Sequence, residues 1–268
     1  MSGFRLGMPT LIELPDAAAN VDLAGRLGLS FVELNMDLPA NAPAALPAAD
    51  LRRLTEQTGV GFTVHLPERL PLASPHERIR SGYLAFCIET IRWAAQAGID
   101  LVNMHLNRGT YFSLPDRKVW VNERYAGGFG DRLEGAFAAL LKPARAGGVK
   151  LCIENTGAWG LGFVREALER ILALDETWIG LTWDTGHEAG GDFQDRPILE
   201  QWEGRIAHVH LHDFAAGRDH QVPFTGCVDI SAALGLAKRL DIGVVIETKT
   251  ADALTESVKA LDPHKSAR

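Results

Sequence analysis

Three histidines alternate with apolar residues in the segment Ile206-Ala-His-Val-His-Leu-His-Asp213. Side chains of a β-strand point alternately to its two faces, so His208, His210 and His212 share one face of the strand that this pattern predicts. Each buried imidazole nitrogen needs a hydrogen-bond partner, which makes three such rings costly in an ordinary apolar core. Any one of them could be a core histidine with satisfied nitrogens. Imidazole is also the commonest metal-ligating side chain, and the cluster as a whole indicates a metal or catalytic site.

Histidines and carboxylates also end most of the other segments that are predicted as strands. Six successive apolar segments end in a residue of this kind: His65, His105, Glu154, Asp184, His210 and Glu247. A lone carboxylate there is more often a helix cap or a solvated side chain, but six in succession are hard to explain in that way. Bare carboxylates gathered at one edge would repel one another, and a divalent cation would remove the conflict. The mixture of nitrogen and oxygen donors suits Mn²⁺, Zn²⁺, Fe²⁺ or Co²⁺, and suits Mg²⁺ less.

The segments that must position these residues repeat one pattern of apolar strand, loop, amphipathic helix and glycine. Eight strands are predicted, at residues 4–12, 31–35, 62–65, 101–105, 150–154, 179–184, 206–213 and 242–247. Eight strand–helix units in 268 residues predict an α/β fold, a single (β/α)8 TIM barrel with a parallel eight-stranded sheet, whose active site lies at the carboxyl ends of the strands. An open doubly wound sheet is the alternative, and the lack of a glycine-rich phosphate loop after the first strand counts against it. We expect the barrel to occupy residues 1–262 and a short C-terminal tail to occupy residues 263–268.

Two of the connecting segments carry signals of their own. Ser74-Pro-His-Glu77 has the sequence of a capping box with proline at the first helical position, so a helix is expected to begin there. Residues 106–130 form a long loop that is rich in aromatic side chains. Loops of this length are usually functional or disordered, and the aromatic content favours a lid over a site. Its arginines could hold a phosphate, but a solvated charge is the simpler interpretation for Arg108, Arg117 and Arg124.

Composition limits the classes of partner and the cellular setting. The chain carries a formal net charge of −7, which argues against a large surface for binding nucleic acid. Three cysteines without CxxC spacing favour free thiols and a cytoplasmic location. The N-terminus does not read as a signal peptide, and no apolar run reaches the roughly 20 residues that span a bilayer. The expected partner is therefore a small carbohydrate, with no nucleic acid and no membrane, and the sequence leaves homo-oligomerisation open.

Four motifs at the predicted strand ends resemble those of the xylose isomerase-like TIM-barrel superfamily, which includes sugar isomerases, ketose 3-epimerases, inosose-processing enzymes and endonuclease IV. They are Glu154-Asn-Thr, Trp183-Asp184-Thr-Gly-His187, His208-Val-His210-Leu-His-Asp213 and Ile246-Glu247. The motifs are short, but their order at successive strand ends is specific, and the resemblance covers nearly the whole chain. It implies that one divalent metal ion is held by four ligands: Glu154, Asp184, His210 and Glu247.

By the same resemblance, the chain is expected to be a metal-dependent isomerase or epimerase of a sugar, a sugar phosphate or a polyol-derived ketose. The metal ion would polarise the carbonyl group and stabilise an enediolate, while Glu154 and Glu247 would remove and return the proton. Four histidines would bind substrate: His65, His105, His187 and His220.

Some residues also resemble the multi-zinc site of endonuclease IV. A phosphodiester hydrolase is therefore the alternative, with a related lyase or dehydratase as a third class. His65 and His105 match residues that hold an additional zinc ion in that enzyme, and His220 matches a further zinc-binding histidine. The nuclease has an aspartate two residues before that histidine, where this chain has Arg218, and here Asp219 comes one position later. We expect one tightly held metal ion, because this departure spoils the further zinc site and the negative charge is unsuited to DNA.

Overall fold

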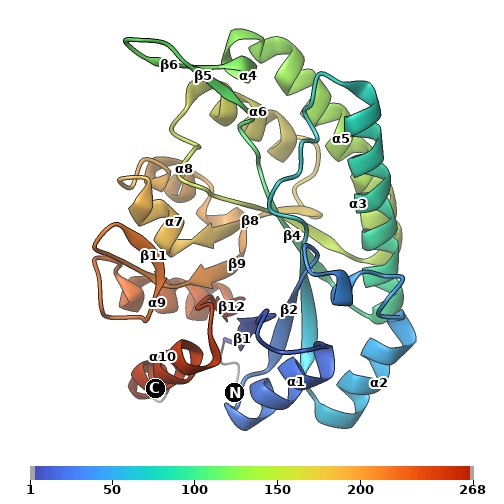
Figure 1. Cartoon of the computed structure of the whole chain (residues 1–268), viewed down its shortest axis with the longest axis vertical. Coiled ribbons are helices and arrows are strands. Elements are labelled where there is room, and N and C mark those ends of the chain that lie inside the picture. The colour runs from blue at the N-terminus through green and yellow to red at the C-terminus, as the bar shows by residue number, and fades with distance from the viewer. Residues whose placement is uncertain (1–3, 266–268) are drawn as a thin grey trace.

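Eight short strands close into a parallel barrel in the computed structural model, which describes residues 4–265 (Figure 1). Around the barrel the strands follow the order β1 (Leu6–Pro9), β12 (Gly243–Ile246), β9 (Ile206–Leu211), β8 (Ile179–Asp184), β7 (Lys150–Glu154), β4 (Leu101–His105), β3 (Gly61–His65) and β2 (Phe31–Asn35). Neighbouring strands of the barrel pair in parallel. The single (β/α)8 barrel predicted from the repeating strand–helix pattern is confirmed.

Helices cover the outside of the barrel, because each presents an apolar face to the strands. The longer ones are α1 (Ala17–Arg26), α2 (Ala48–Thr58), α3 (Glu77–Ala97), α5 (Ala126–Gly147), α6 (Gly162–Leu172), α9 (Ile230–Leu240) and α10 (Ala251–Lys265). In α6, Val164, Leu168 and Ile171 are buried at the spacing of one helical face. Across residues 4–265, none of the helices combines the length and the apolar character that a membrane span requires.

Short elements occupy several loops between the barrel strands. After β4 come β5 (Tyr111–Ser113), β6 (Lys118–Trp120) and α4 (Val121–Arg124), and after β8 come α7 (Thr185–Gly190), α8 (Arg196–Gln201) and the 3-10 helix η2 (Glu203–Arg205). A hairpin of β10 (Asp213–Ala215) and β11 (Arg218–Gln221) follows β9, and a 3-10 helix, η1 (Pro39–Asn41), follows β2. The segment 106–130, expected to be a loop, is therefore largely a hairpin, a short helix and the first turn of α5.

The predicted start of α3 is wrong. The helix begins at Glu77 with His76 as its N-cap, and no side chain caps it. Ser74 Oγ instead accepts a hydrogen bond from His76 N over 3.2 Å, two residues along the chain. Serine often closes such a local turn, and the turn competes with helix capping for the same hydroxyl group.

Three strands are shorter than predicted, among them β12, which covers Gly243–Ile246 rather than residues 242–247, and the last helix is longer. The first strand covers Leu6–Pro9 rather than residues 4–12, and β9 ends at Leu211, so His212 lies just beyond it. The barrel was expected to end at residue 262, but its last helix, α10, runs to Lys265. The part of the expected tail at residues 266–268 lies outside the described residues.

The three cysteines are free thiols. Cys87 and Cys152 are buried, and burial raises the pKa of each thiol to about 12. Cys227 is exposed. Because the thiolate is the reactive form, Cys227 is the cysteine open to modification in the folded protein.

Candidate metal centre

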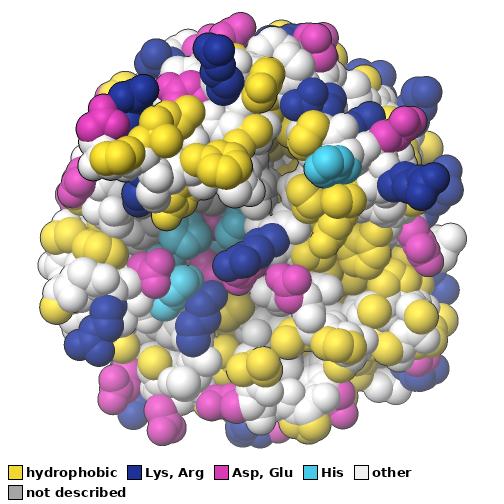
Figure 2. Space-filling view, turned by 45° about the horizontal axis from the view of Figure 1, so that its top comes forward, with side chains coloured by type: hydrophobic (Ala, Val, Ile, Leu, Met, Phe, Trp, Pro, Cys, Tyr) yellow, Lys and Arg dark blue, Asp and Glu magenta, His cyan; other side chains and the backbone are white. Residues whose placement is uncertain are grey.

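A cavity of about 700 Å³ opens at the carboxyl ends of the strands. Four histidines in its walls are those expected to bind substrate: His65, His105, His187 and His220. Glu247 also lines the cavity, whereas Glu154, Asp184 and His210 are fully buried. Figure 2 shows histidine and acidic side chains gathered in one hollow of the surface, with Lys or Arg side chains at its edge.

Three of the four expected metal ligands converge on the ring of the fourth, His210. Its Nδ1 lies 3.0 Å from Glu247 Oε2, 3.3 Å from Glu154 Oε2 and 3.8 Å from Asp184 Oδ2. Two atoms that each lie about 2.1 Å from one metal ion, at a right angle, are about 3.0 Å apart. These separations therefore suit ligands of a common ion, supplied by β7, β8, β9 and the end of β12.

Several buried polar atoms of this cluster have no hydrogen-bond partner among the described residues, including His210 Nδ1, His187 Nδ1 and Glu247 Oε2. His210 Nδ1 and Glu247 Oε2 are only 3.0 Å apart, yet their alignment does not make a hydrogen bond. This arrangement is expected when donor atoms point at a shared centre. A buried polar atom without a partner costs roughly 1–3 kcal/mol, and a bound cation would satisfy such atoms, so the donor set fits a divalent metal ion.

Glu154 contacts three further imidazoles as well as His210. Its carboxylate lies 3.2 Å from His65 Nε2, 3.0 Å from His105 Nε2 and 3.1 Å from His187 Nδ1. A carboxylate has two oxygen atoms and can bridge two cations. Donor atoms close enough to share an ion group His65 with Glu154 and His210, and group His105 with Glu154 and His187.

Carboxylates and imidazoles of this cluster shift one another's pKa values. Burial alone would raise the pKa of Glu154, but the positive charge of His105 and other imidazoles holds it well below its usual range. Burial alone would lower the pKa of His187, yet the carboxylates, Asp184 first among them, raise it to about 10. His65 shows the same balance, and its hydrogen bond to Glu154 raises its pKa to about 9. A cation that enters such a site displaces protons.

Two side-chain amides fix the ligands on β7 and β8. Asn155 Oδ1 accepts a hydrogen bond from Asp184 N over 2.7 Å, and Asn155 Nδ2 donates to Asp184 O over 2.9 Å. Below them, Thr182 Oγ1 donates to Asn103 Oδ1 over 2.7 Å, and Asn103 Nδ2 donates to Glu154 Oε2. These bonds hold the ends of the two strands in register and leave Glu154 little freedom to rotate.

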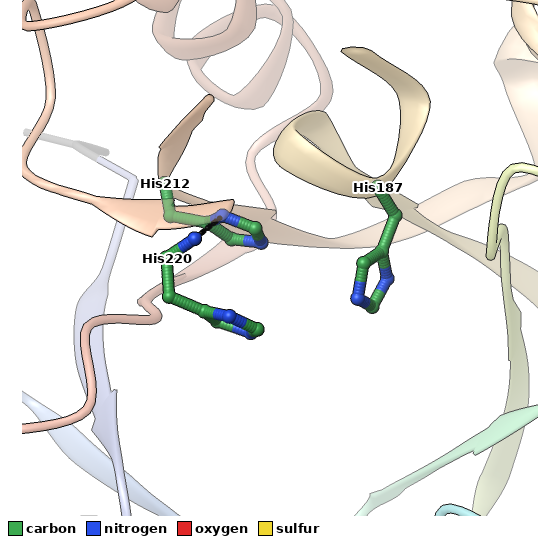
Figure 3. A group of neighbouring side chains, drawn as sticks. All are labelled: His187, His212 and His220. Atoms are coloured by element: carbon green, nitrogen blue, oxygen red, sulfur yellow. Dashed lines mark hydrogen bonds between the residues drawn. The ribbon is translucent and has the colours of Figure 1, made fainter. Parts of the chain in front are cut away.

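Three histidines face one another on one side of the cavity, with His187 on α7, His212 just after β9 and His220 on β11 (Figure 3). His220 N donates a 2.8 Å hydrogen bond to His212 Nδ1, so a neutral His212 carries its proton on Nε2, which lies 3.0 Å from Asp184 Oδ1. The rings of His212 and His220 are stacked, with 4.4 Å between centroids. The packing depends on Gly186, because a Cβ atom there would lie 2.1 Å from His212 Cε1.

Asp219 reaches these histidines although it stands one position later than in the endonuclease IV pattern. Its Oδ1 lies 2.6 Å from His220 Nδ1, and its Oδ2 lies 3.9 Å from His187 Nε2. A carboxylate is therefore present beside His187 and His220, which the residue at position 218 alone did not indicate.

Several charged residues of the site were missed in the sequence, among them Glu33 and Lys249. Glu33 on β2 is buried and lies 2.8 Å from His210 Nε2 and 3.0 Å from His208 Nε2. Lys249 Nζ donates a 2.7 Å hydrogen bond to Glu247 Oε1. A glutamate inside an apolar strand is a usable signal, because a buried charge needs a partner. The signal does not identify the partner, and here one partner, His208, lies 175 residues along the chain.

The aromatic segment that was expected to form a lid stands apart from the cavity. None of the described residues 106–130 lines the cavity, and Tyr111 and Phe112 of the β5–β6 hairpin are 41% and 65% exposed. Figure 1 shows this hairpin projecting beyond α4 at the top of the molecule. Arg108 lies over Trp120, 4.7 Å from the ring centroid. A covering role for the segment during a reaction stays a prediction.

Comparison with known proteins identifies the family. The family described as xylose isomerase-like TIM barrel matches residues 21–264, and the chain belongs to it. A solved D-tagatose 3-epimerase-like protein is similar to this chain, with a TM-score of 0.77, 22% identity, and coverage of 98% of this chain and 97% of the other. No curated protein matches the chain in sequence.

Two further solved structures share the fold. The 3-keto-D-glucoside 4-epimerase of E. coli aligns with a TM-score of 0.73 and 16% identity, over 96% of this chain and 97% of the other. The IolI protein, whose structure contains a bound zinc atom, aligns with a TM-score of 0.72 and 17% identity, over 97% of both chains. At these identities the likeness concerns the fold, and the chemistry must be argued from the side chains.

Proposed function

We propose that the protein is a divalent-metal-dependent sugar isomerase or epimerase that transfers a proton next to a carbonyl group. The observation that carries the proposal is the convergence of Glu154, Asp184 and Glu247 on His210 Nδ1 below the cavity. A volume of about 700 Å³ suits a small-molecule ligand. The names of similar solved structures support a carbohydrate substrate and a metal ion: a D-tagatose 3-epimerase-like protein, a 3-keto-D-glucoside 4-epimerase and a protein with a bound zinc atom.

Different residues in and beneath the cavity are assigned to metal binding, proton transfer and substrate binding. A divalent cation held by the four ligands would polarise a sugar carbonyl and stabilise the negative charge that develops on it. Glu154 and Glu247 approach the centre from different strands, with β8 and β9 between them in the sheet, and we assign them the removal and return of the proton. Four histidines in the walls offer ring nitrogens to substrate hydroxyl groups: His65, His105, His187 and His220.

Solvent isotope exchange tests the proposed proton transfer. Protein stripped of metal and reloaded with Mn²⁺, Zn²⁺, Co²⁺ or Fe²⁺ is offered a panel of ketoses and their phosphates in D₂O. Metal-dependent deuterium incorporation next to the carbonyl, measured by NMR, is the expected result. Glu154→Gln and Glu247→Gln should each lower the exchange rate about 100-fold or more, and Glu56→Gln, on an exposed face of α2, is the matched control. Absence of exchange with every substrate and metal would contradict the proposal.

A phosphodiester hydrolase related to endonuclease IV is the second candidate. One observation favours it, which is the contact of Glu154 with both His65 and His105, since a second ion could bind there. We expect one tightly bound metal ion per chain, in the wild type and in a His65→Ala, His105→Ala double variant alike, and little metal in His210→Ala. Two ions that fall to one in the double variant, together with cleavage of an abasic-site oligonucleotide, would support the hydrolase instead.

A further inference from the structure

Glu33 is a buried side chain in the lining of the cavity, and it contacts the Nε2 side of the His210 ring. It belongs to β2, whereas His210 belongs to β9, and two strands, β1 and β12, separate them in the sheet. Glu33 is 3% exposed, and its Oε1 lies 2.8 Å from His210 Nε2. Its other oxygen, Oε2, lies 3.0 Å from His208 Nε2 and accepts a hydrogen bond from Thr63 Oγ1 over 3.1 Å.

The ring of His210 therefore has two nitrogens in different surroundings. Nδ1 faces the carboxylates of Glu154, Asp184 and Glu247. Nε2 has no aligned hydrogen bond among the described residues, and among them only Glu33, at 2.8 Å, forms an ion pair with it. A neutral imidazole carries one ring proton, and a metal ligand needs its lone pair free. Nδ1 can bind a cation only if the proton resides on Nε2.

We propose that Glu33 is a positioning residue of the metal centre, which accepts the Nε2 proton of His210 and so keeps Nδ1 free and aimed at the other three ligands. Histidine ligands of metal ions commonly donate their second ring N–H to a carboxylate, and loss of that partner typically weakens metal affinity 10–100-fold. The proposal rests on His210 being a metal ligand, as in the proposed function, but it does not depend on which sugar is converted.

The surroundings of Glu33 favour this role over space filling. An ionised carboxylate inside a barrel is costly, and an apolar side chain of similar volume would fill the space at lower cost. Thr63 and His208 both lie against Oε2, which leaves Oε1 directed at His210. The three contacts thus hold the carboxylate in one orientation relative to the metal centre.

Metal affinity in matched variants tests the proposal directly. Zn²⁺ and Mn²⁺ dissociation constants are measured by competition with a chelator for the wild type, Glu33→Gln and Glu33→Met, with thermal unfolding as a check on folding. Gln keeps an acceptor but loses the charge, and Met keeps the volume but loses the acceptor. We expect affinity about 10-fold weaker in Glu33→Gln and about 100-fold weaker in Glu33→Met.

Glu188→Gln is the matched control for removal of a buried glutamate. Glu188 is 1% exposed and pairs with Arg196 and Trp183 rather than with the metal centre. It should lower the unfolding temperature without a change in metal affinity. Wild-type affinity in folded Glu33→Met, or in Glu33→Gln if the Met variant does not fold, would overturn the proposal.

Two further measurements distinguish a failure of this proposal from a failure of the proposed function. They are a double-mutant cycle and the location of the ring proton of His210. In a His210→Ala background, Glu33→Gln should have no further effect on metal affinity. In ¹⁵N NMR of the Zn²⁺-loaded wild type, the proton of His210 should reside on Nε2. If His210→Ala itself leaves the affinity unchanged, the ligand assignment and the proposed function fail together. If only the Glu33 variants are without effect, this inference alone fails.

Discussion

The two hairpins at the carboxyl end of the barrel differ in how they are attached to it. The β5–β6 hairpin is rich in aromatic residues. Tyr111 lies against Trp120 at 5.0 Å within the hairpin, and Trp120 packs against the core, while Tyr111 and Phe112 are exposed. The β10–β11 hairpin has few apolar residues, yet it packs against α7 and places Asp219 and His220 in the cavity wall. Hydrogen bonds to the buried carboxylate of Asp213 attach the second hairpin to the barrel, while the first hairpin exposes aromatic side chains to solvent. The comparison shows that apolar composition alone does not tell which loop belongs to a site.

Asp213 is the residue that anchors the β10–β11 hairpin. It is fully buried, and its carboxylate accepts hydrogen bonds from three backbone N–H groups, those of Phe214, Gly226 and Val228, over 2.8–3.0 Å. Among the described residues no buried carboxylate anchors β5–β6 in this way, and Asp116 of that hairpin is exposed and pairs with its neighbour Arg117.

Asp213→Ala should have the largest effect, because it leaves three partly buried backbone donors unpaired. We expect the unfolding free energy to fall by about 3 kcal/mol and turnover to fall about 100-fold as His220 and Asp219 shift. Chemical denaturation and steady-state kinetics measure the two effects. Asp116→Ala, on the other hairpin, should change the stability by less than about 0.5 kcal/mol. Equal effects of the two substitutions would show that the hairpins do not differ in the way described.

The barrel was predictable from the sequence because its signal is local. Apolar strands, helical periods and glycines between them recur eight times, and the residues that end the strands follow directly from that pattern. The site required contacts that the sequence does not encode locally. Glu33 lies within an apolar strand, and only closure of the barrel brings it to His210. The capping box at Ser74 shows that a local signal can also mislead. Its serine closes a turn to His76, two residues along, and does not cap the helix.

Gly186→Ala should disturb the second hairpin from the side of α7. The new Cβ would lie 2.1 Å from His212 Cε1, so the ring must move and lose its contacts with His220 N and Asp184. We expect metal affinity to fall about 10-fold, the lower end of the range for partners of metal ligands. Gly127→Ala, in α5 near the first hairpin, has open space around the new Cβ. That control should stabilise the helix by up to about 1 kcal/mol. Unchanged metal affinity in Gly186→Ala would mean that His212 does not orient Asp184.

The affinity for a metal ion should depend on pH, because two histidines in the cavity wall have raised pKa values. This wall is the one that the second hairpin completes. In the metal-free protein the pKa values of His65 and His187 are raised to about 9 and about 10, because nearby carboxylates outweigh burial. Both groups therefore hold protons at pH 7 and release them only as the pH rises through those values. Metal affinity should increase with pH from 6 to 9, by up to about tenfold per unit for each displaced proton. Calorimetry in two buffers of different ionisation enthalpy counts the protons, and binding without proton release would contradict the assignment.

The same raised pKa values predict how the metal-free protein responds to alkali. A raised folded-state pKa stabilises the fold below the unfolded value near 6.5, and this contribution is lost as the pH rises through about 9 to 10. The metal-free protein should therefore lose stability between pH 7 and pH 10, while metal-loaded protein should lose less. Thermal unfolding at a series of pH values, with and without Zn²⁺, measures the difference.

Phe112→Ser should have the smallest effect, because the side chain is 65% exposed and belongs to the hairpin that stands apart from the cavity. We expect the unfolding free energy to change by less than about 0.5 kcal/mol and metal affinity to stay the same. If the hairpin closes over a bound sugar, as its aromatic content predicts, kcat should fall by a few-fold while the metal site is untouched. Measuring kcat and the metal dissociation constant on one preparation distinguishes these contributions. A tenfold loss of metal affinity would show that β5–β6 is part of the centre after all, and the contrast between the two hairpins would no longer hold.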